Sequence, residues 1–336
     1  MKARLHPLSV ALISIVLQCT PIELKGESRT FVSTAGTAIE GELVSVNGDM
    51  VTLKKVDGQT LTIKSSNFSP ADIAYLQAHG LKPAAVSSEF AKASKERPFV
   101  NSLGMKFVPV PGTKVLFCTT ITRIQDYNVY AAATGVSPAS KDWWKLQRPG
   151  PVLLKWDDSL SWEESKAFCV WLGAKEGCTY RLPTDREWSI AIGIGNQENA
   201  TMTPEELNGK LKNVYPWGTQ WPPPNAFGNY GDESFRLYCK KINYQPTPVT
   251  IPGYKDGELG IAPVGMFQAD KLGLYDMSGN LWQWCEDWFD AAKSKHYGRG
   301  GCWTSSTQEK LLSSARETED LEGNISFRCV IEVPGL

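Results

Sequence analysis

The sequence predicts an α+β protein of two units, in which a small β-barrel precedes a larger domain built mainly of loops. Its 336 residues suffice for two domains of roughly 150 residues each. All twelve Trp lie between Trp143 and Trp303, so the amino-terminal third differs in composition from the rest. Beyond residue 98 the chain is dense in Gly, Pro and Trp and has few stretches of helical periodicity, which is typical of loops held by aromatic side chains.

Composition and charge exclude several classes of protein. An apolar content of 42% with 21% charged residues is typical of a globular protein and excludes disorder, collagen and coiled coil. The formal net charge of −1 offers no basic face for a nucleic-acid backbone. Only three His are present (His6, His79, His296) and no Cys pair has C-x-x-C spacing, which excludes zinc fingers and thioredoxin-like motifs. The P-loop, G-x-G-x-x-G and H-E-x-x-H motifs are absent as well.

Residues 1–25 have the pattern of a secretory signal peptide. Lys2 and Arg4 precede an apolar run from Leu8 to Leu17, which is too short for a resident membrane helix. We therefore expect export to the periplasm or the cell exterior, with no integral membrane segment after signal removal. Cys19 follows a string that loosely resembles a lipoprotein cleavage box, so anchoring through Cys19 is an alternative. Export would place the other seven Cys where disulfides persist.

Residues 26–80 have the pattern of a small antiparallel β-barrel. Alternating runs at 41–46 and 50–54 are separated by Asn47-Gly48, and Asp57-Gly58 follows the second run; both dipeptides are strong two-residue hairpin signals. Ser69 and Pro70 predict the start of a short helix that ends at Gly80. Residues 81–98, rich in Ala, Ser and Lys, indicate a linker to the domain at 99–336.

This first unit resembles the SLA1 homology domain 1 type of SH3-like module. The resemblance implies a peptide-binding or spacing module. The strings that carry it are Ile39-Glu-Gly-Glu-Leu-Val44, Val51-Thr-Leu53, Asp57-Gly58-Gln59 and Leu76-Gln-Ala-His-Gly80.

Two helices are predicted in the larger domain. One runs from Ile124 to Thr134 and ends at Gly135, which suits a left-handed helix end. The other begins at Ser161, where Ser-Trp-Glu-Glu164 forms a capping box, and an apolar stripe follows at helical spacing.

Six strings of the larger domain together closely resemble the sulfatase-modifying factor family, whose founding members are formylglycine-generating enzymes. The resemblance spans residues 99–332 and implies a compact, loop-rich α+β fold related to C-type lectins. The strings are Asn101-Ser-Leu-Gly-Met-Lys-Phe-Val-Pro109, Tyr180-Arg-Leu-Pro-Thr-Asp-Arg-Glu-Trp188, Tyr215-Pro-Trp-Gly218, Gly273-Leu-Tyr-Asp-Met-Ser-Gly-Asn-Leu-Trp-Gln-Trp284, Arg299-Gly-Gly301 and Ile325-Ser-Phe-Arg-Cys329.

Oxygen donors at calcium spacing occur in the fourth of these strings. A turn that contains Gly and is flanked by two side-chain oxygens suits a hard cation. The residues alone leave open an Asx-turn with a buried Gln and no ion. The resemblance implies Ca²⁺ at two sites, and Gln283 stands where the family usually has Glu. The implied ligands are Asp276, the carbonyls of Gly279 and Leu281, and Gln283 at one site, and Asn229, the Tyr230 carbonyl, Asp256 and the Glu258 carbonyl at the other.

The resemblance also implies a disulfide between Cys169 and Cys329. On chain-entropy grounds such a long loop would stabilise the fold by roughly 4 to 5 kcal/mol. An odd number of Cys is left in the domain, so one thiol stays free or pairs between chains. These are Cys118, Cys178, Cys239, Cys285 and Cys302. Trp282 and Trp284 are interpreted as packed core, with a ligand platform as the alternative.

The catalytic chemistry of the family does not match this sequence. Formylglycine-generating enzymes oxidise a client Cys with two thiolates that hold Cu(I), and the resemblance places these four and nine residues after Gly301. Ser305 and Lys310 stand there. Because Cu(I) prefers polarisable thiolates and an ammonium repels a cation, we expect no copper. Cys302 is the one thiol left nearby, and we favour a buried thiol or a bridge to Cys285 over a reactive group.

We therefore expect an exported family member that has lost the copper-binding pair and binds a protein, a peptide or a glycan. One alternative is an active formylglycine-generating oxidoreductase with a sulfatase client, which would need copper at Cys302 and a distant thiol. Another is a structural envelope component. The related sulfoxide synthases use three His at iron, and His296 is the only His of the domain, which excludes that branch.

Overall fold

The computed structural model describes residues 28–33, 36–47, 50–79, 90–139, 160–241, 243, 245, 247–319, 321 and 323–333. The expected signal peptide and Cys19 lie outside the described residues. Within these ranges no helix is both long enough and apolar enough to cross a membrane.

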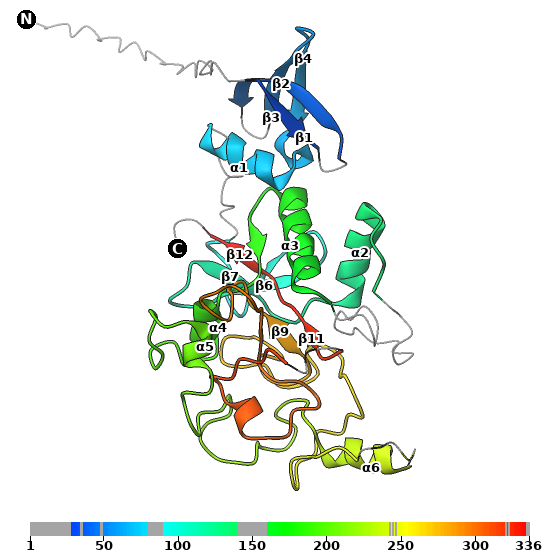
Figure 1. The fold of residues 1–336 in the computed structure, drawn as a ribbon, viewed down its shortest axis with the longest axis vertical. Coiled ribbons are helices and arrows are strands. Elements are labelled where there is room, and N and C mark those ends of the chain that lie inside the picture. The colour runs from blue at the N-terminus through cyan, green and yellow to red at the C-terminus, as the bar shows by residue number, and fades with distance from the viewer. Residues whose placement is uncertain are drawn as a thin grey trace, which may run out of the picture.

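The first unit is a four-stranded antiparallel sheet in which neighbouring strands follow chain order (Figure 1). Its strands are β1 (Arg29–Val32), β2 (Ala38–Asn47), β3 (Met50–Lys55) and β4 (Thr60–Lys64). Both hairpins are confirmed, because Asn47 pairs with Met50 and Lys54 pairs with Thr60. The second turn is longer than the two residues expected. Lys55 N donates to Gln59 O at 2.8 Å, and Gly58 has a φ of 84°, which is typical of a three-residue loop.

Helix α1 (Pro70–Ala78) covers this sheet after a short 3₁₀ turn, η1 (Ser65–Asn67), and confirms the helix predicted after Ser69. The buried Asp72 ties the helix to β1. Its carboxylate lies 2.6 Å from Arg29 Nη2 and accepts hydrogen bonds from Val32 N and Ser69 Oγ. A bridge between Ser33 and Phe68 joins the two ends of the sheet. Within the described residues β1 and β4 do not pair, so the strand pairing is that of an open sheet.

Of the linker expected at 81–98, residues 90–98 lie in the described part of the chain. Phe90 is buried and packs edge-on against Phe99, with ring centroids 4.6 Å apart. Lys95 Nζ donates to the carbonyl of Lys271 at 3.1 Å. Residues 90–98 therefore pack against the larger domain, because their apolar side chains find a core there.

A five-stranded antiparallel sheet forms the centre of the larger domain. Its order is β5 (Phe99–Val100), β6 (Lys106–Pro109), β7 (Val115–Cys118), β12 (Val330–Glu332) and β8 (Tyr180–Arg181). Alternate residues face two different cores: Phe107 and Leu116 lie in one, and Val108 and Phe117 lie in the other. Burial on both faces explains why all four residues of β7 are apolar.

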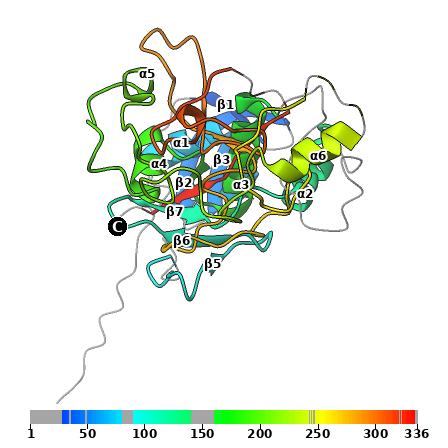
Figure 2. The ribbon, with the colours of Figure 1, turned by 90° about the horizontal axis from the view of Figure 1, so that it is seen from below.

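Both helices predicted for this domain are confirmed. Helix α2 spans Ile124–Thr134 with Gly135 at its left-handed end, and α3 spans Trp162–Glu176 with the Ser161 capping box. They cover one face of the sheet. Three further helices were not predicted, although capping boxes at Thr184 and Thr203 precede the first two. These are α4 (Asp185–Ala191), α5 (Pro204–Leu207) and α6 (Glu233–Lys241), and Figure 2 shows α6 on the side opposite α4 and α5.

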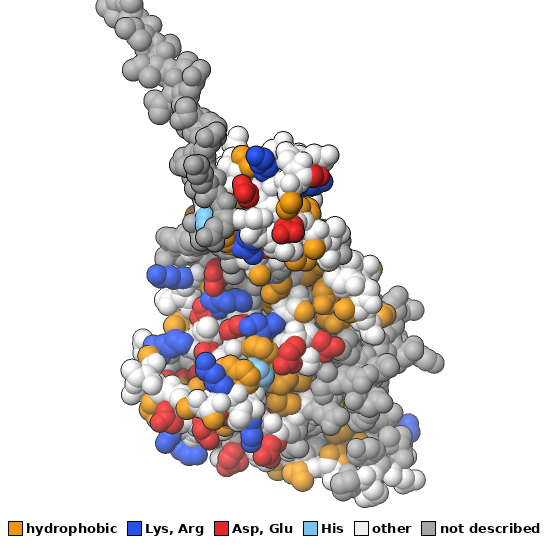
Figure 3. All heavy atoms as spheres, turned by 45° about the horizontal axis from the view of Figure 1, so that its top comes forward, with side chains coloured by type: hydrophobic (Ala, Val, Ile, Leu, Met, Phe, Trp, Pro, Cys, Tyr) orange, Lys and Arg blue, Asp and Glu red, His pale blue; other side chains and the backbone are white. Residues whose placement is uncertain are grey.

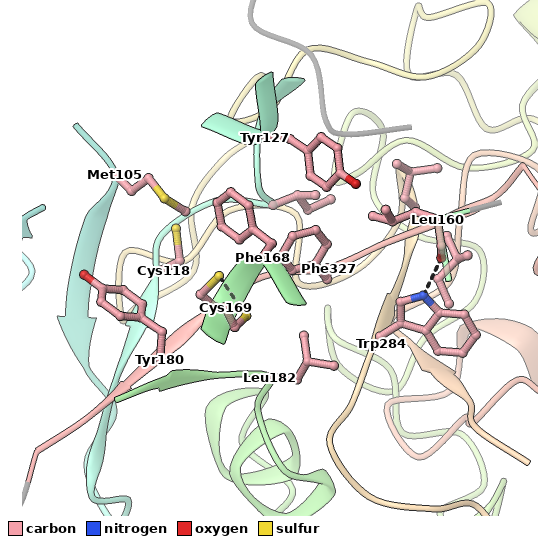
Figure 4. Packing of buried hydrophobic residues seen from close by; sticks show 14 of the residues in the cluster. Met105, Cys118, Tyr127, Leu160, Phe168, Cys169, Tyr180, Leu182, Trp284 and Phe327 are labelled. Carbon is pink, nitrogen blue, oxygen red and sulfur yellow. Dashed lines mark hydrogen bonds between the residues drawn. The ribbon is translucent and has the colours of Figure 1, made fainter. Parts of the chain in front are cut away.

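A second, mixed sheet lies among the loops. Strand β9 (Trp282–Trp284) pairs antiparallel with β10 (Gly298–Arg299) and parallel with β11 (Ile325–Ser326). The 3₁₀ turn η2 (Glu309–Leu311) lies between β10 and β11 in sequence. Trp282 and Trp284 are buried, as expected of packed core, and Trp284 Nε1 donates to Leu160 O at 2.8 Å (Figure 4). The mixed sheets, few helices and long loops agree with the predicted α+β class.

Four buried charges connect the loops behind β10. Arg299 and Arg316 each lie 2.6 Å from the Asp185 carboxylate, and Arg316 also lies 2.9 Å from Glu198. Both guanidinium side chains are fully buried. Burial opposes ionisation of Asp185, but the two guanidinium groups hold its pKa below the usual value. Figure 3 shows that on the outer face charges of both signs are instead interspersed.

Replacing Arg316 by Met should destabilise the protein by roughly 3 to 5 kcal/mol, because Glu198 would remain buried without its guanidinium partner. The measurement is urea unfolding followed by tryptophan fluorescence. Arg236→Met is the control, since Arg236 forms a partly exposed i,i+3 pair within one surface helix and its loss should change stability little. Equal effects of the two substitutions would contradict this prediction.

Candidate functional site

A cleft of about 810 Å³ lies over the second sheet. Its walls come from β9, β11 and three loops distant in sequence. The apolar side chains are those of Pro248, Val249, Trp282, Trp284, Leu321 and Ile325, and the polar or charged ones are those of Cys302, Thr304, Ser306, Lys310, Thr318, Glu319 and Asn324. Such a mixture of apolar walls with a few polar groups is typical of a binding site.

The floor of the cleft depends on two glycines that follow β10. Gly300 and Gly301 have φ values of 99° and 80°, which side chains rarely adopt. A Cβ on Gly300 would lie 2.9 Å from the backbone carbonyl oxygen of Met277, so the turn has no room for one there. This close turn places Cys302 at the floor with only 2% of its surface exposed.

The Cys302 thiol is surrounded by hydroxyl groups. Its Sγ lies 3.2 Å from Thr304 Oγ1 and 3.4 Å from Ser305 Oγ, and its amide donates to Ser305 Oγ at 3.0 Å. Ser305 is buried and caps this turn. Cys302 is the only cysteine among the described lining residues of the cleft.

Lys310 is brought to the same place. Ser305 and Lys310 both lie close to Gly301. A Cβ built on Gly301 would be 3.7 Å from Ser305 Oγ and 3.6 Å from the backbone carbonyl oxygen of Lys310. The Lys310 ammonium lies 3.4 Å from Glu317 Oε2. The site therefore presents one thiol, hydroxyl groups and an ammonium.

The remaining thiols lie away from the cleft. Cys169 and Cys329 are buried with their sulfurs 3.3 Å apart (Figure 4), and both are free thiols in the structure. The sequence thus predicted their proximity, and the bridge itself stays a prediction. Cys285 belongs to a different core cluster from Cys302, and burial raises its pKa well above the ordinary value. The bridge considered between Cys285 and Cys302 is absent, because both are free thiols.

The calcium site expected at Asn229 and Asp256 contains a partly buried carboxylate with oxygen atoms around it. Asp256 accepts hydrogen bonds from Tyr230 N and Glu258 N, each at 2.9 Å. Burial and the neighbouring Asp232 and Glu258 carboxylates raise its pKa to about 7, although the two backbone hydrogen bonds lower it. Asn229 is fixed beside it by donating its amide to Gly260 O at 2.7 Å. Oxygen donors beside a partly buried carboxylate are the type that a hard cation takes, although the acidic side chains here do not cluster closely enough to hold a metal on their own.

In the other expected calcium site, at Asp276 and Gln283, the oxygen atoms are already engaged in hydrogen bonds. Gln283 Oε1 accepts from Arg328 Nε at 2.6 Å, and Gln283 Nε2 donates to Asp276 O at 2.7 Å. Gly279 O accepts from Leu281 N, and Asp276 Oδ2 accepts from Gly265 N, both at 2.9 Å. These residues fit a calcium ion poorly. Among the described residues, no three His, Cys, Asp or Glu side chains cluster in a way that could hold a metal.

Several residues of the cleft were not found by sequence reasoning. Val249 and Thr304 have exposed side chains at its rim, and Glu319 and Leu321 come from a separate loop. No local pattern marks them, since they meet only through the packing of loops distant in sequence. The signals in the sequence for this place were the Arg299-Gly-Gly301 string and the strings that contain Trp282, Trp284 and Ile325.

Comparison with known proteins points to one family. A family model described as "Sulfatase-modifying factor enzyme 1-like domain" matches residues 120–333. "Inactive C-alpha-formylglycine-generating enzyme 2" of Bos taurus is 28% identical over 179 residues, which cover 51% of this chain and 48% of that protein. "Formylglycine-generating enzyme" of Thermomonospora curvata is 33% identical over 132 residues, which cover 39% of this chain and 33% of that one.

Solved structures were compared as well. "Structure of PvdO from Pseudomonas aeruginosa" aligns with a TM-score of 0.43 at 18% identity, and covers 65% of this chain and 80% of that one. "Crystal Structure of CarF" aligns with a TM-score of 0.39. The chain spans half or less of the length of the curated relatives named above.

Asp256 should make the stability of the ion-free protein depend on pH. Its pKa is about 7 in the folded state and near 3.9 when unfolded, so the folded state binds more protons between these values. Stability should therefore fall as pH rises from about 4 to 7, and Asp256→Asn should remove this part of the fall. Melting temperatures in chelator at pH 5 and pH 8 test this, with Asp57→Asn in an exposed turn as the control. An unchanged pH dependence in Asp256→Asn would contradict it.

Proposed function

Because this chain belongs to the family with a sulfatase-modifying factor enzyme 1-like domain, we propose that its cleft has kept the family's place for a client and lost the copper chemistry. The cleft then binds a peptide segment of another protein. One observation carries the proposal: at the cleft floor Cys302 lies among hydroxyl groups, with Ser305 and Lys310 beside the same Gly-Gly turn.

The donor set opposes Cu(I) for chemical reasons. Two-coordinate Cu(I) needs a pair of soft thiolates, and a hydroxyl is a hard donor. Lys310 likewise supplies no thiolate, and its ammonium lies 3.4 Å from Glu317 Oε2. The similarity to a protein named as an inactive formylglycine-generating enzyme supports the same interpretation.

The lining favours a peptide over a glycan. Trp282 and Trp284 expose only 1% and 9% of their surfaces, so neither indole presents a broad face for a sugar ring. Val249 exposes 75% of its side chain at the rim, and Leu321 and Ile325 extend the apolar wall. Lys310 and Glu319 supply charges of both signs at the edge. Apolar pockets with a few charged groups suit alternate side chains of an extended peptide.

Calcium is proposed as a structural ion of the site built on Asn229 and Asp256. The side chains of these two residues and the carbonyls of Tyr230 and Glu258 would hold it. The ion would neutralise the buried Asp256 carboxylate and so stabilise the folded loops.

Two further expectations from the sequence remain proposals. The unit at 29–79 is proposed to be an SH3-like spacing or peptide-binding module, supported by its four-stranded sheet and its own core around Phe31 and Leu53. The pattern at residues 1–25 supports export, which would make the partner an exported protein. The relation to C-type lectins likewise stays an implication of the family resemblance.

The purified chain, supplied with copper and oxygen, should not convert a Cys-x-Pro-x-Arg peptide to its aldehyde, because the cleft lacks a thiolate pair. Mass spectrometry of the peptide measures the product. The double substitution Ser305→Cys with Lys310→Cys should gain a Cu(I) site, read by competition with a chromophoric chelator. Aldehyde formed by the unaltered chain and lost in Cys302→Ala would overturn the proposal in favour of the oxidoreductase.

Filling the cleft should abolish peptide binding. Thr304 has an exposed side chain on the cleft wall, so Thr304→Trp should occupy the space without disturbing the core. Arrays of random peptides and of glycans are probed with the labelled chain, and at least tenfold loss of peptide signal is expected for the variant. Val56→Trp, on an exposed turn of the first unit, is the matched control. Binding to glycans alone, or to neither array, would refute a peptide-binding cleft.

A further inference from the structure

We infer that the Asp276–Gln283 turn is closed by a cation of the chain itself, the Arg328 guanidinium, and takes no calcium. The domain then holds a single calcium ion, at the site of Asn229 and Asp256. This inference rests on the calcium proposed above only for the count of one. Its own content concerns the turn at Asp276.

Arg328 fills the space beside this turn with a saturated set of hydrogen bonds. Its side chain is fully buried, and it donates to Gln283 Oε1 at 2.6 Å, Tyr275 O at 2.7 Å, Cys118 O at 3.0 Å and Asp276 O at 3.2 Å. A guanidinium presents five N–H donors in a fixed plane, so four acceptors around it make a nearly complete set. The turn and β7 are thereby joined through one positive group.

Gln283 is the residue that permits this closure. Its amide bridges the two partners, since Oε1 accepts from Arg328 while Nε2 donates to the carbonyl of Asp276. A buried amide with both ends paired needs no further ligand. Calcium binding would have to break the hydrogen bond from Gln283 Nε2 to Asp276 O, or compete with Arg328 for Gln283 Oε1.

The net charge of the residues at this turn also opposes calcium binding. Asp276 and Arg328 carry one negative and one positive charge, and Gln283 is neutral, so the group is neutral without an ion. A divalent cation would leave two positive charges in excess in a buried site, which is strongly unfavourable. Because Arg328 lies in a string that matches the family, the change of balance comes from Gln283, where the family usually has Glu.

The site at Asp256 has the opposite balance. The Asp232 and Glu258 carboxylates act on Asp256, so the local charge is negative, although the three do not cluster closely enough to hold a metal on their own. No lysine or arginine salt bridge to Asp256 is found in the described part of the chain. A divalent cation would be stabilised at this place and destabilised at the other.

The test is the calcium stoichiometry of the full chain, measured by equilibrium dialysis after stripping with chelator. The unaltered chain should bind one ion and Asp256→Asn none. Gln283→Glu should bind two, because the added carboxylate neutralises Arg328 and gives the group a net negative charge beside Asp276. Gln308→Glu, an exposed position with the same change of charge, is the matched control and should still bind one.

The outcomes separate the two claims. Two ions on the unaltered chain, or loss of an ion in Asp276→Asn, would overturn the inference. A folded Gln283→Glu protein, checked by circular dichroism, that gains no ion would overturn the role given to Gln283. No ion on the unaltered chain but one on Gln283→Glu would refute calcium at Asp256 and leave the inference standing.

Discussion

The buried pairing of Arg299 and Arg316 with Asp185 and Glu198 is the constraint on which the rest of the larger domain depends. Taking four charges out of water is costly, and their mutual pairing and hydrogen bonds offset that cost, although Arg299 Nε has no hydrogen-bond partner among the described residues. The four residues come from α4, β10 and two loops, so the network fixes loops that have few regular hydrogen bonds of their own. Since Arg299 directly precedes Gly300-Gly301, the position of the cleft floor depends on this network.

The elements that the sequence predicted are those with local causes. Helices α2 and α3 begin and end where their caps stand, at Gly135 and at Ser161, and the hairpins follow their Gly-containing turns. Local sequence patterns did not predict how the strands of the larger domain pair. The last strand, β12, inserts between β7 and β8, and β11 pairs with β9 across about forty residues. Such pairings are set by which apolar faces find each other, which no window of sequence records.

The residues of the candidate site likewise divide into those that local sequence predicted and those that only the fold brings together. Sequence reasoning found Cys302, Ser305 and Lys310 because they follow one Gly-Gly string, and the structure places them around that turn. It missed the rim at Val249 and Glu319, which reaches the cleft through tertiary packing alone. It expected calcium at both sites, with weaker affinity where Gln283 replaces the family's Glu. The contact between Gln283 and Arg328 joins residues 45 positions apart, so the sequence did not show that a guanidinium occupies this turn.

A family fold can outlast its chemistry because different residues carry the two properties. The Gly300-Gly301 turn, the buried charges behind it and the apolar faces of the central sheet determine the shape of the cleft, and all of them are present here. The metal chemistry needs only two sulfur atoms at its floor. At the two positions where the resemblance implies thiolates, a buried hydroxyl caps the Cys302 amide and an ammonium pairs with Glu317, so both side chains have a structural role. This is the basis on which the proposal assigns the cleft to binding, since walls and metal chemistry rest on different residues.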